Sequence, residues 1–156
     1  MIERNNVDQE KALLVGVIQP GTTESQIHEH LDELELLAET AGAKIAGRIT
    51  QRVSKINPAT FIGKGKAEEL LNQAKELGVK LIVFDDELSS GQIKNYHKIS
   101  ENVKVLDRSG LILDIFHKHA KTKEARTQVD LAYMEYLLPR LTRQWTHLER
   151  QMGGIG

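Results

Sequence analysis

The 156-residue chain is 40% hydrophobic and 28% charged, and it contains no cysteine. This length suits one domain, or one domain with an appendage, and the apolar fraction argues against wholesale disorder. The lack of cysteine excludes disulfides, iron–sulfur clusters and thiolate zinc sites within these residues. No apolar run approaches the roughly 20 residues of a membrane span, and the polar start does not resemble a signal peptide. We therefore expect a soluble, cytoplasmic protein without a membrane partner.

The net charge of −1 conceals an asymmetry along the chain. Residues 1–107 contain 13 basic and 17 acidic side chains, whereas residues 108–156 contain 8 basic and 5 acidic ones. A basic C-terminal third is typical of a segment that meets a polyanion, although a solvated helix face has the same composition. Both interpretations stay open on charge alone.

The N-terminal segment has the pattern of a strand, a turn and a helix. Residues 11–18 are a nearly continuous apolar run, as a strand covered on both faces requires. Thr23 with Gln26 three residues later is a capping-box signature, and apolar residues then recur at helical spacing. Gly42 is placed to end this helix.

Residues 43–54 alternate in polarity with a period of two, which predicts a strand with one solvated face. The side chains expected on one face are Ile45, Ile49 and Val53, and those expected on the other are Arg48, Thr50 and Arg52.

Three further elements complete the first two thirds of the chain. A loop at residues 61–66 leads into a helix that closes at Gly78, and residues 80–84 read as another buried strand. Ser89 and Gln92 form a second capping box that opens a helix, and residues 103–106 read as a short fourth strand. Strands alternating with helices predict an α/β fold with a four-stranded, mostly parallel sheet and flanking helices.

The last third reads as a long helical arm. We therefore divide the chain into an α/β subdomain at residues 1–107 and an arm at residues 108–156. Apolar residues of the arm follow a coiled-coil spacing, at Leu131, Met134, Leu138, Leu141, Trp145, Leu148 and Met152. Upstream, Ile112, Phe116 and Ala120 continue an apolar face, and Pro139 predicts a kink or break near Leu138. The stripe has no partner in this sequence, so we expect the chain to self-associate or to fold back on itself.

The Gly63-Lys64-Gly65-Lys66 loop is a candidate anion or nucleotide site, because helix-start amides and two lysines suit an anion. It is not a Walker A loop, since Thr60 and Ala67 stand where that motif needs glycine and Ser or Thr. A tight turn that needs positive φ, flanked by solvated lysines, is the alternative interpretation.

The acidic run Asp85-Asp86-Glu87 follows a buried strand, at the sheet edge where open α/β folds usually bind ligands. Asp85 and Asp86 are therefore candidates for nucleotide contact, and Mg²⁺ coordination is one interpretation of the run. Carboxylates ahead of a helix are also favourable for purely electrostatic reasons.

No metal site and no catalytic site is predicted in the chain. The histidine pairs His28/His30 and His117/His119 are each two residues apart, so on a helix they point in different directions and cannot share a metal. There is no G-x-S-x-G turn and no cysteine nucleophile.

Six strings, taken in order, resemble the N-terminal domain of the HflX family of ribosome-associated GTPases. They lie at residues 61–70, 83–89, 107–116, 128–132, 136–141 and 153–156. The resemblance covers nearly everything from residue 12 to residue 156. It implies an α/β subdomain, an antiparallel helical hairpin with a glycine-rich tip, and then a GTPase domain.

The resemblance places the end of this chain at the beginning of the hairpin tip. The arm would then be the first half of the hairpin, and its partners would be the second hairpin helix and the protein's own GTPase domain. GTP and Mg²⁺ are expected for that GTPase domain, and no cofactor is expected for this chain. The chain itself is not expected to be an enzyme, whereas the full-length protein is expected to hydrolyse GTP.

The resemblance further implies binding to the large ribosomal subunit and its rRNA, and action on stalled ribosomes under stress or on their assembly. The matching positions that would contact RNA are Lys64, Lys66, Arg140, Arg143 and Arg150. Two alternatives stay open. The α/β part would bind a nucleotide of its own and regulate the GTPase domain, or the chain would dock on that domain and modulate its turnover without touching RNA.

Overall fold

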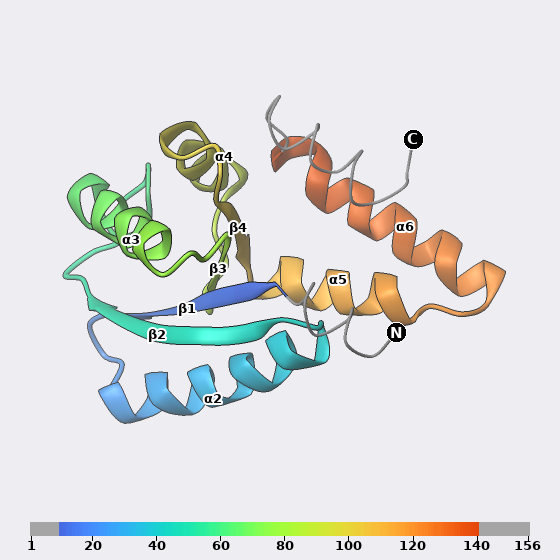
Figure 1. Ribbon diagram of the computed structural model, residues 1–156, viewed down its shortest axis with the longest axis horizontal. Helices are drawn as coiled ribbons and strands as arrows, with labels where there is room; N and C mark the ends of the chain where they lie inside the picture. Colours follow the sequence, from blue (N-terminus) through green and yellow to red (C-terminus); the bar gives the residue numbers. More distant parts are fainter. Residues whose placement is uncertain (1–9, 141–156) are drawn as a thin grey trace.

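Four parallel strands form one sheet in the computed structural model, which describes residues 10–140 (Figure 1). The strands are β1 (Lys11–Ile18), β2 (Lys44–Arg52), β3 (Leu81–Phe84) and β4 (Lys104–Asp107). Their order across the sheet is β2-β1-β3-β4, and every neighbouring pair is parallel. The predicted α/β class and four-stranded sheet are confirmed, and the carboxyl ends of the strands share one edge.

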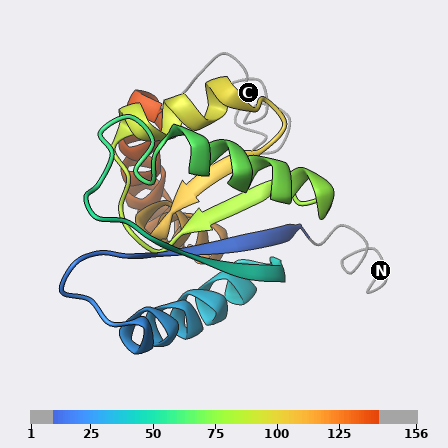
Figure 2. The ribbon, with the colours of Figure 1, turned by 90° about the vertical axis from the view of Figure 1, so that its left-hand side faces the viewer.

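Five α-helices accompany the sheet in the described part of the chain. They are α2 (Glu24–Thr40), α3 (Lys64–Glu76), α4 (Ser90–Ile99), α5 (Arg108–His119) and α6 (Lys123–Leu137). Helices α3 and α4 lie above the sheet and α2 lies below it in Figure 2. Helix α5 packs beside α2, and α6 lies against α5.

Each face of the sheet carries its own apolar cluster because the side chains of β1 alternate between the two. Leu14 and Ile18 pack with the buried residues of α2 and α5. Leu13 and Val15 pack with those of α3 and α4. Burial on both faces explains why β1 reads as a nearly continuous apolar run.

The predicted helix boundaries are confirmed at two capping boxes and at one glycine. The side chains of Thr23 and Ser89 each accept a hydrogen bond at 3.1 Å from the backbone amide of the glutamine three residues later. Gly42, just past α2, has φ of 97°, in the left-handed region that glycine adopts without strain.

One prediction about β2 is wrong. The register shifts between Ala12 and Leu13, so that Ala12 pairs with Ile45 whereas Leu13 pairs with Gly47. An extra residue in one strand moves the following side chains to the opposite face. Ile45 consequently packs on the α2 side, whereas Ile49 and Val53 pack on the α3 side.

The chain after β4 forms two helices that run side by side (Figure 1). Leu111 of α5 is buried in the apolar cluster that fills the space between the sheet and α2. The apolar face expected to continue through Phe116 differs from the observed one, because Phe116 is 56% exposed. Thr122 caps α6 by accepting from the amide of Ala125 at 3.0 Å, and this cap separates the two helices.

Helix α6 turns three buried residues toward the α/β body, which comprises the sheet and helices α2 to α5, and turns an apolar stripe away from it. Tyr133, Tyr136 and Leu137 are buried. Leu131 and Leu138 of the stripe are 62% and 60% exposed. The helix gives way at Leu138–Arg140 to a 3₁₀ turn, which confirms the break predicted from Pro139. The stripe positions from 141 onward lie outside the described residues.

None of the helices in residues 10–140 is long and apolar enough to cross a membrane.

Candidate functional site

The Gly63–Lys66 loop forms the start of α3, close to the carboxyl end of β2. Gly63 has φ of 99°. It occupies the N-cap position of α3, where no side chain forms a capping hydrogen bond. Lys64, Gly65 and Lys66 are exposed in the first turn. The first α3 amides therefore lack side-chain capping, which suits an anion electrostatically.

A groove of about 340 Å³ lies beside this helix start. Three of its lining residues are basic, namely Arg52, Lys55 and Lys66, and none of the lining residues is acidic. Lys66 also pairs with Glu69 at 3.4 Å, an exposed contact along the helix, and such contacts hold a side chain only weakly. The arrangement makes the groove electropositive. Sequence reasoning missed Arg52 and Lys55, although a basic residue at the carboxyl end of a strand is a usable signal.

Helix α4 holds the segment that walls this groove. Gln92 Nε2 donates to the Asn57 carbonyl and Asn95 Nδ2 to the Ala59 carbonyl, each at 2.8 Å. The Tyr96 hydroxyl donates to the Thr60 carbonyl at 2.7 Å. Three side chains of one helix therefore hold the segment at residues 57–60, and this preorganises the wall of the groove that Asn57 forms.

The acidic run after β3 lies at the topological switch point, where β1 and β3 are neighbours. Arg108 donates both through Nε, at 3.0 Å, and through Nη2 to the carboxylate of Asp85. His30 Nδ1 lies 3.6 Å from the same carboxylate. The charge of Asp85 is therefore neutralised within the protein, which leaves little of it for a ligand.

Asp86 is the residue of this acidic run whose pKa is shifted. Burial, and then the neighbouring charge of Asp85, raises its pKa to about 6. Its Oδ2 atom is buried and has no hydrogen-bond partner among the described residues. Within residues 10–140 no group of three His, Asp or Glu side chains is placed to hold a metal ion.

Arg140, predicted to contact RNA, is engaged inside the protein. Its Nη1 donates to the Tyr136 carbonyl at 2.8 Å, and its guanidinium carbon lies 3.9 Å from the Tyr136 ring centroid. It thus lies near the start of α4, whereas Lys66 lines the groove at the end of β2. Arg143 and Arg150 lie outside the described residues.

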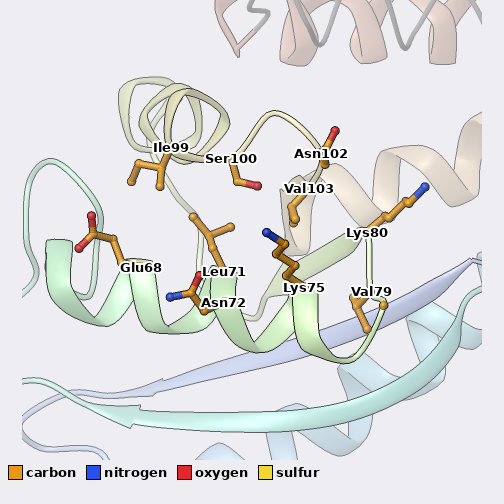
Figure 3. Close-up of a pocket in the computed structure, with 11 residues that line it drawn as sticks. Glu68, Leu71, Asn72, Lys75, Val79, Lys80, Ile99, Ser100, Asn102 and Val103 are labelled. Carbon is orange, nitrogen blue, oxygen red and sulfur yellow. The ribbon is translucent and has the colours of Figure 1, made fainter.

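A second groove, of about 710 Å³, lies between α3 and α4 at the opposite edge of the sheet (Figure 3). Leu71, Val79 and Val103 give it an apolar lining, and Lys75 and Lys80 are among its lining residues. No sequence motif pointed to this groove. It borders the amino ends of β3 and β4, the edge that open parallel sheets seldom use for ligands.

Comparison with known proteins places the chain in a family. Residues 28–117 match the family model "GTP-binding GTPase N-terminal", and residues 119–156 match "GTP-binding GTPase Middle Region". The chain is 50% identical to GTPase HflX of Flavobacterium psychrophilum across all of its length, covering 38% of that protein. It is 42% identical to GTPase HflX of Escherichia coli over 94% of its length, covering 34% of that protein.

The fold also matches a solved structure. A GTP-binding protein of Sulfolobus solfataricus, crystallised in complex with GDP, aligns with 94% of this chain and 43% of its own, with a TM-score of 0.65. At 23% sequence identity this likeness supports the fold alone. The chain therefore belongs to the GTP-binding GTPase N-terminal family, and it matches the N-terminal part of HflX-family GTPases, about a third of their length.

Proposed function

We propose that this chain is the ribosome-binding and regulatory N-terminal domain of a GTP-hydrolysing factor that associates with the large ribosomal subunit. The whole protein would act in the cytoplasm on stalled ribosomes under stress, or on ribosome assembly. Family membership supports the GTPase part of the proposal, because the relatives that match are named GTPase HflX. GTP and Mg²⁺ would belong to the GTPase domain. The described residues offer no metal-binding group, and their Asp85 is already paired with Arg108.

The observation that carries RNA binding is the electropositive groove at the start of α3. Arg52, Lys55 and Lys66 line it without any carboxylate. RNA phosphates are attracted to such a surface, and binding releases condensed counterions into solution. The Gly63–Lys66 helix start adds a partial positive charge on the same side. The groove therefore suits a phosphodiester backbone and carries no residue that would repel one.

Ribosome pelleting at several salt concentrations tests this proposal with the full-length protein. The test variant carries Arg52→Ala, Lys55→Ala and Lys66→Ala. The matched control carries Lys75→Ala, Lys80→Ala and Lys98→Ala, which remove the same charge from exposed lysines elsewhere. Log K for ribosome binding decreases as log salt increases. If all three groove cations contact phosphates, this negative slope should become shallower by about 2 in the test variant.

The control variant should keep the wild-type affinity and salt slope. Equal binding by the two triple variants at every salt concentration would overturn the role of the groove. A separate Arg143→Ala, Arg150→Ala variant tests the predicted contacts of the arm. Arg140 is left intact in that variant, because it packs on Tyr136.

The nucleotide-binding alternative draws support from one feature, the buried Asp86 oxygen without a partner at the switch point. Calorimetry with ATP and GTP on this chain tests it. Heat that disappears in an Asp86→Ala variant would favour the alternative. Comparison of GTP hydrolysis with and without this domain, in the absence of ribosomes, tests regulation that needs no RNA.

A further inference from the structure

A buried carboxylate, that of Asp107, links helix α6 to the α/β body by a hydrogen bond. Asp107 is 1% exposed, and it both ends β4 and caps α5. Its Oδ2 accepts from the backbone amide of Leu88 at 3.0 Å. Its Oδ1 accepts from the amide of Gly110 at 2.9 Å and from the hydroxyl of Tyr136. One side chain therefore joins the loop ahead of α4, the first turn of α5 and the last turn of α6.

The close packing of Tyr136 against α5 explains why residue 110 is a glycine. A Cβ on Gly110 would lie 2.5 Å from the Tyr136 hydroxyl oxygen and 2.8 Å from the ring carbon that bears it. The backbone of Gly110 does not have a positive φ, so its own conformation does not require glycine. The close approach of Tyr136 requires glycine here, because any larger side chain at residue 110 would overlap the tyrosine. Helix α6 therefore packs at this point with no spare volume.

Arg140 forms a second link between α6 and the loop ahead of α4. Its guanidinium packs over the Tyr136 ring, and its Nη2 donates to the Leu88 carbonyl at 3.5 Å. Burial, followed by the charge of Asp107, raises the pKa of Tyr136, so its hydroxyl stays protonated and can donate. Hydrogen bonds to a buried charge are stronger than neutral ones.

We propose that Asp107, Gly110, Tyr136 and Arg140 form a latch that couples the position of α6 to the loop at residues 85–88. Leu88 is held by Asp107 on its amide and by Arg140 on its carbonyl. Ser109 of α5 also donates to Glu87 in that loop. A contact that displaces the loop would weaken the seating of α6, and release of α6 would loosen the loop to the same extent in free energy.

This inference goes beyond the proposed function, because it requires neither RNA nor nucleotide. It assigns separate roles to the two kinds of contact that α6 makes. The apolar contacts of Tyr133 and Leu137 hold the helix against the body. The latch fixes the direction in which the helix leaves the body, because directional hydrogen bonds specify one geometry.

Two variants and one matched control test the latch. Gly110→Ala forces a Cβ into the Tyr136 ring, and Tyr136→Phe removes the hydroxyl while it keeps the shape. Gly91→Ala is the control, since Gly91 also lies in the first turn of a capped helix and its Cβ would have no neighbour closer than 3.9 Å. Because the chain has no cysteine, spin labels can be placed at Glu39→Cys on α2 and Gln128→Cys on α6, both exposed.

The distance distribution between the labels should be narrow in the wild type and in Gly91→Ala, and broader in both latch variants. Amides of α6 and the amide of Leu88 should exchange about tenfold faster in Tyr136→Phe, and faster still in Gly110→Ala. Amides of β1 should keep their wild-type rates.

Unchanged distances and unchanged exchange in α6 would overturn the latch. Equal acceleration in β1 and α6 would also overturn it, because it would mean that these residues only stabilise the fold as a whole. If Gly110→Ala does not fold, Tyr136→Phe decides the question, since it adds no atoms to the core. Ribosome binding enters none of these measurements, so failure of the latch is separate from failure of the proposed function.

Discussion

The α/β body and helix α6 are held by different kinds of contact. In the body, α2 alone buries Ile27, Leu31, Leu34 and Ala38 against the sheet. Helix α6 buries three residues, and two of them are tyrosines. Apolar interdigitation tolerates small rearrangements better than a directed hydrogen bond does, but it contributes more stability in total. The body therefore provides stability, and the hydrogen bonds to α6 fix the direction of that helix.

This contrast predicts the largest effect for the deepest apolar residue of α2. Leu34 is fully buried, so Leu34→Ala should lower the free energy of unfolding by about 3–4 kcal/mol. Leu36→Ala, in the same helix but at a side chain that is 67% exposed, should change it by less than about 0.5 kcal/mol. Urea unfolding of both variants measures the difference. Similar losses in the two would contradict the assignment of the buried face.

A polar contact inside the body gives the next largest effect, and it depends on pH. His97 Nε2 accepts from the Val105 amide at 3.1 Å, and burial, with a smaller effect of Lys104, lowers its pKa to about 4. The unfolded chain binds this proton near pH 6.5, so stability is lost as pH falls from 6.5 toward 4, by about 2–3 kcal/mol. A His97→Gln variant, which keeps an acceptor, should lose less stability than the wild type over that range. Identical pH profiles in urea unfolding would refute this.

The third prediction concerns how far a defect in α6 spreads. Leu137 is 2% exposed and lies in the apolar cluster between the sheet and α2. Leu137→Ala should cost about 2 kcal/mol, and hydrogen exchange should show most of this loss in α6 rather than in β1. Leu131→Ala, on the exposed face of the same helix, is the matched control and should exchange like the wild type. Uniform acceleration through the sheet would mean that the body and α6 unfold as one unit.

The smallest effect is a stabilisation at the switch point. The pKa of Asp86 is raised to about 6, so its ionisation opposes folding as pH rises from about 4 to 6. Asp86→Asn should therefore gain about 1 kcal/mol at pH 7, a value reduced for partial exposure, and nothing at pH 4. Thermal unfolding at the two pH values measures this. A gain of equal size at both would point to a cause other than charge.

The sequence predicts the body well because its signals are local. Capping boxes at Thr23 and Ser89, a stop at Gly42 and the apolar run of β1 each depend on residues within a few positions, and the structure confirms all four. The face of Ile45 was predicted wrongly because a bulge beside it is set by pairing with β1, and no periodicity within β2 records that pairing.

The candidate site could be predicted only in part. Lys64 and Lys66 were found from the glycine–lysine loop, but Arg52 and Lys55 join them only through the fold. Asp107 and Tyr136 are 29 positions apart, and nothing in either neighbourhood predicts their hydrogen bond. The resemblance implies that Arg140 contacts RNA, whereas in the structure its guanidinium packs over the Tyr136 ring and donates to the Tyr136 carbonyl. Long-range polar contacts are thus the part that composition and spacing do not reveal.

The bulge in β2 has a consequence for how copies of this protein behave at high concentration. β2 is a nine-residue strand at the edge of the sheet, and a long, regular edge strand is a template for pairing with another chain. The register shift interrupts its regularity, and the exposed Lys44 and Arg52 place positive charge at its two ends. Two such edges repel each other and match poorly, so the strand that lines the groove is protected from edge-to-edge aggregation.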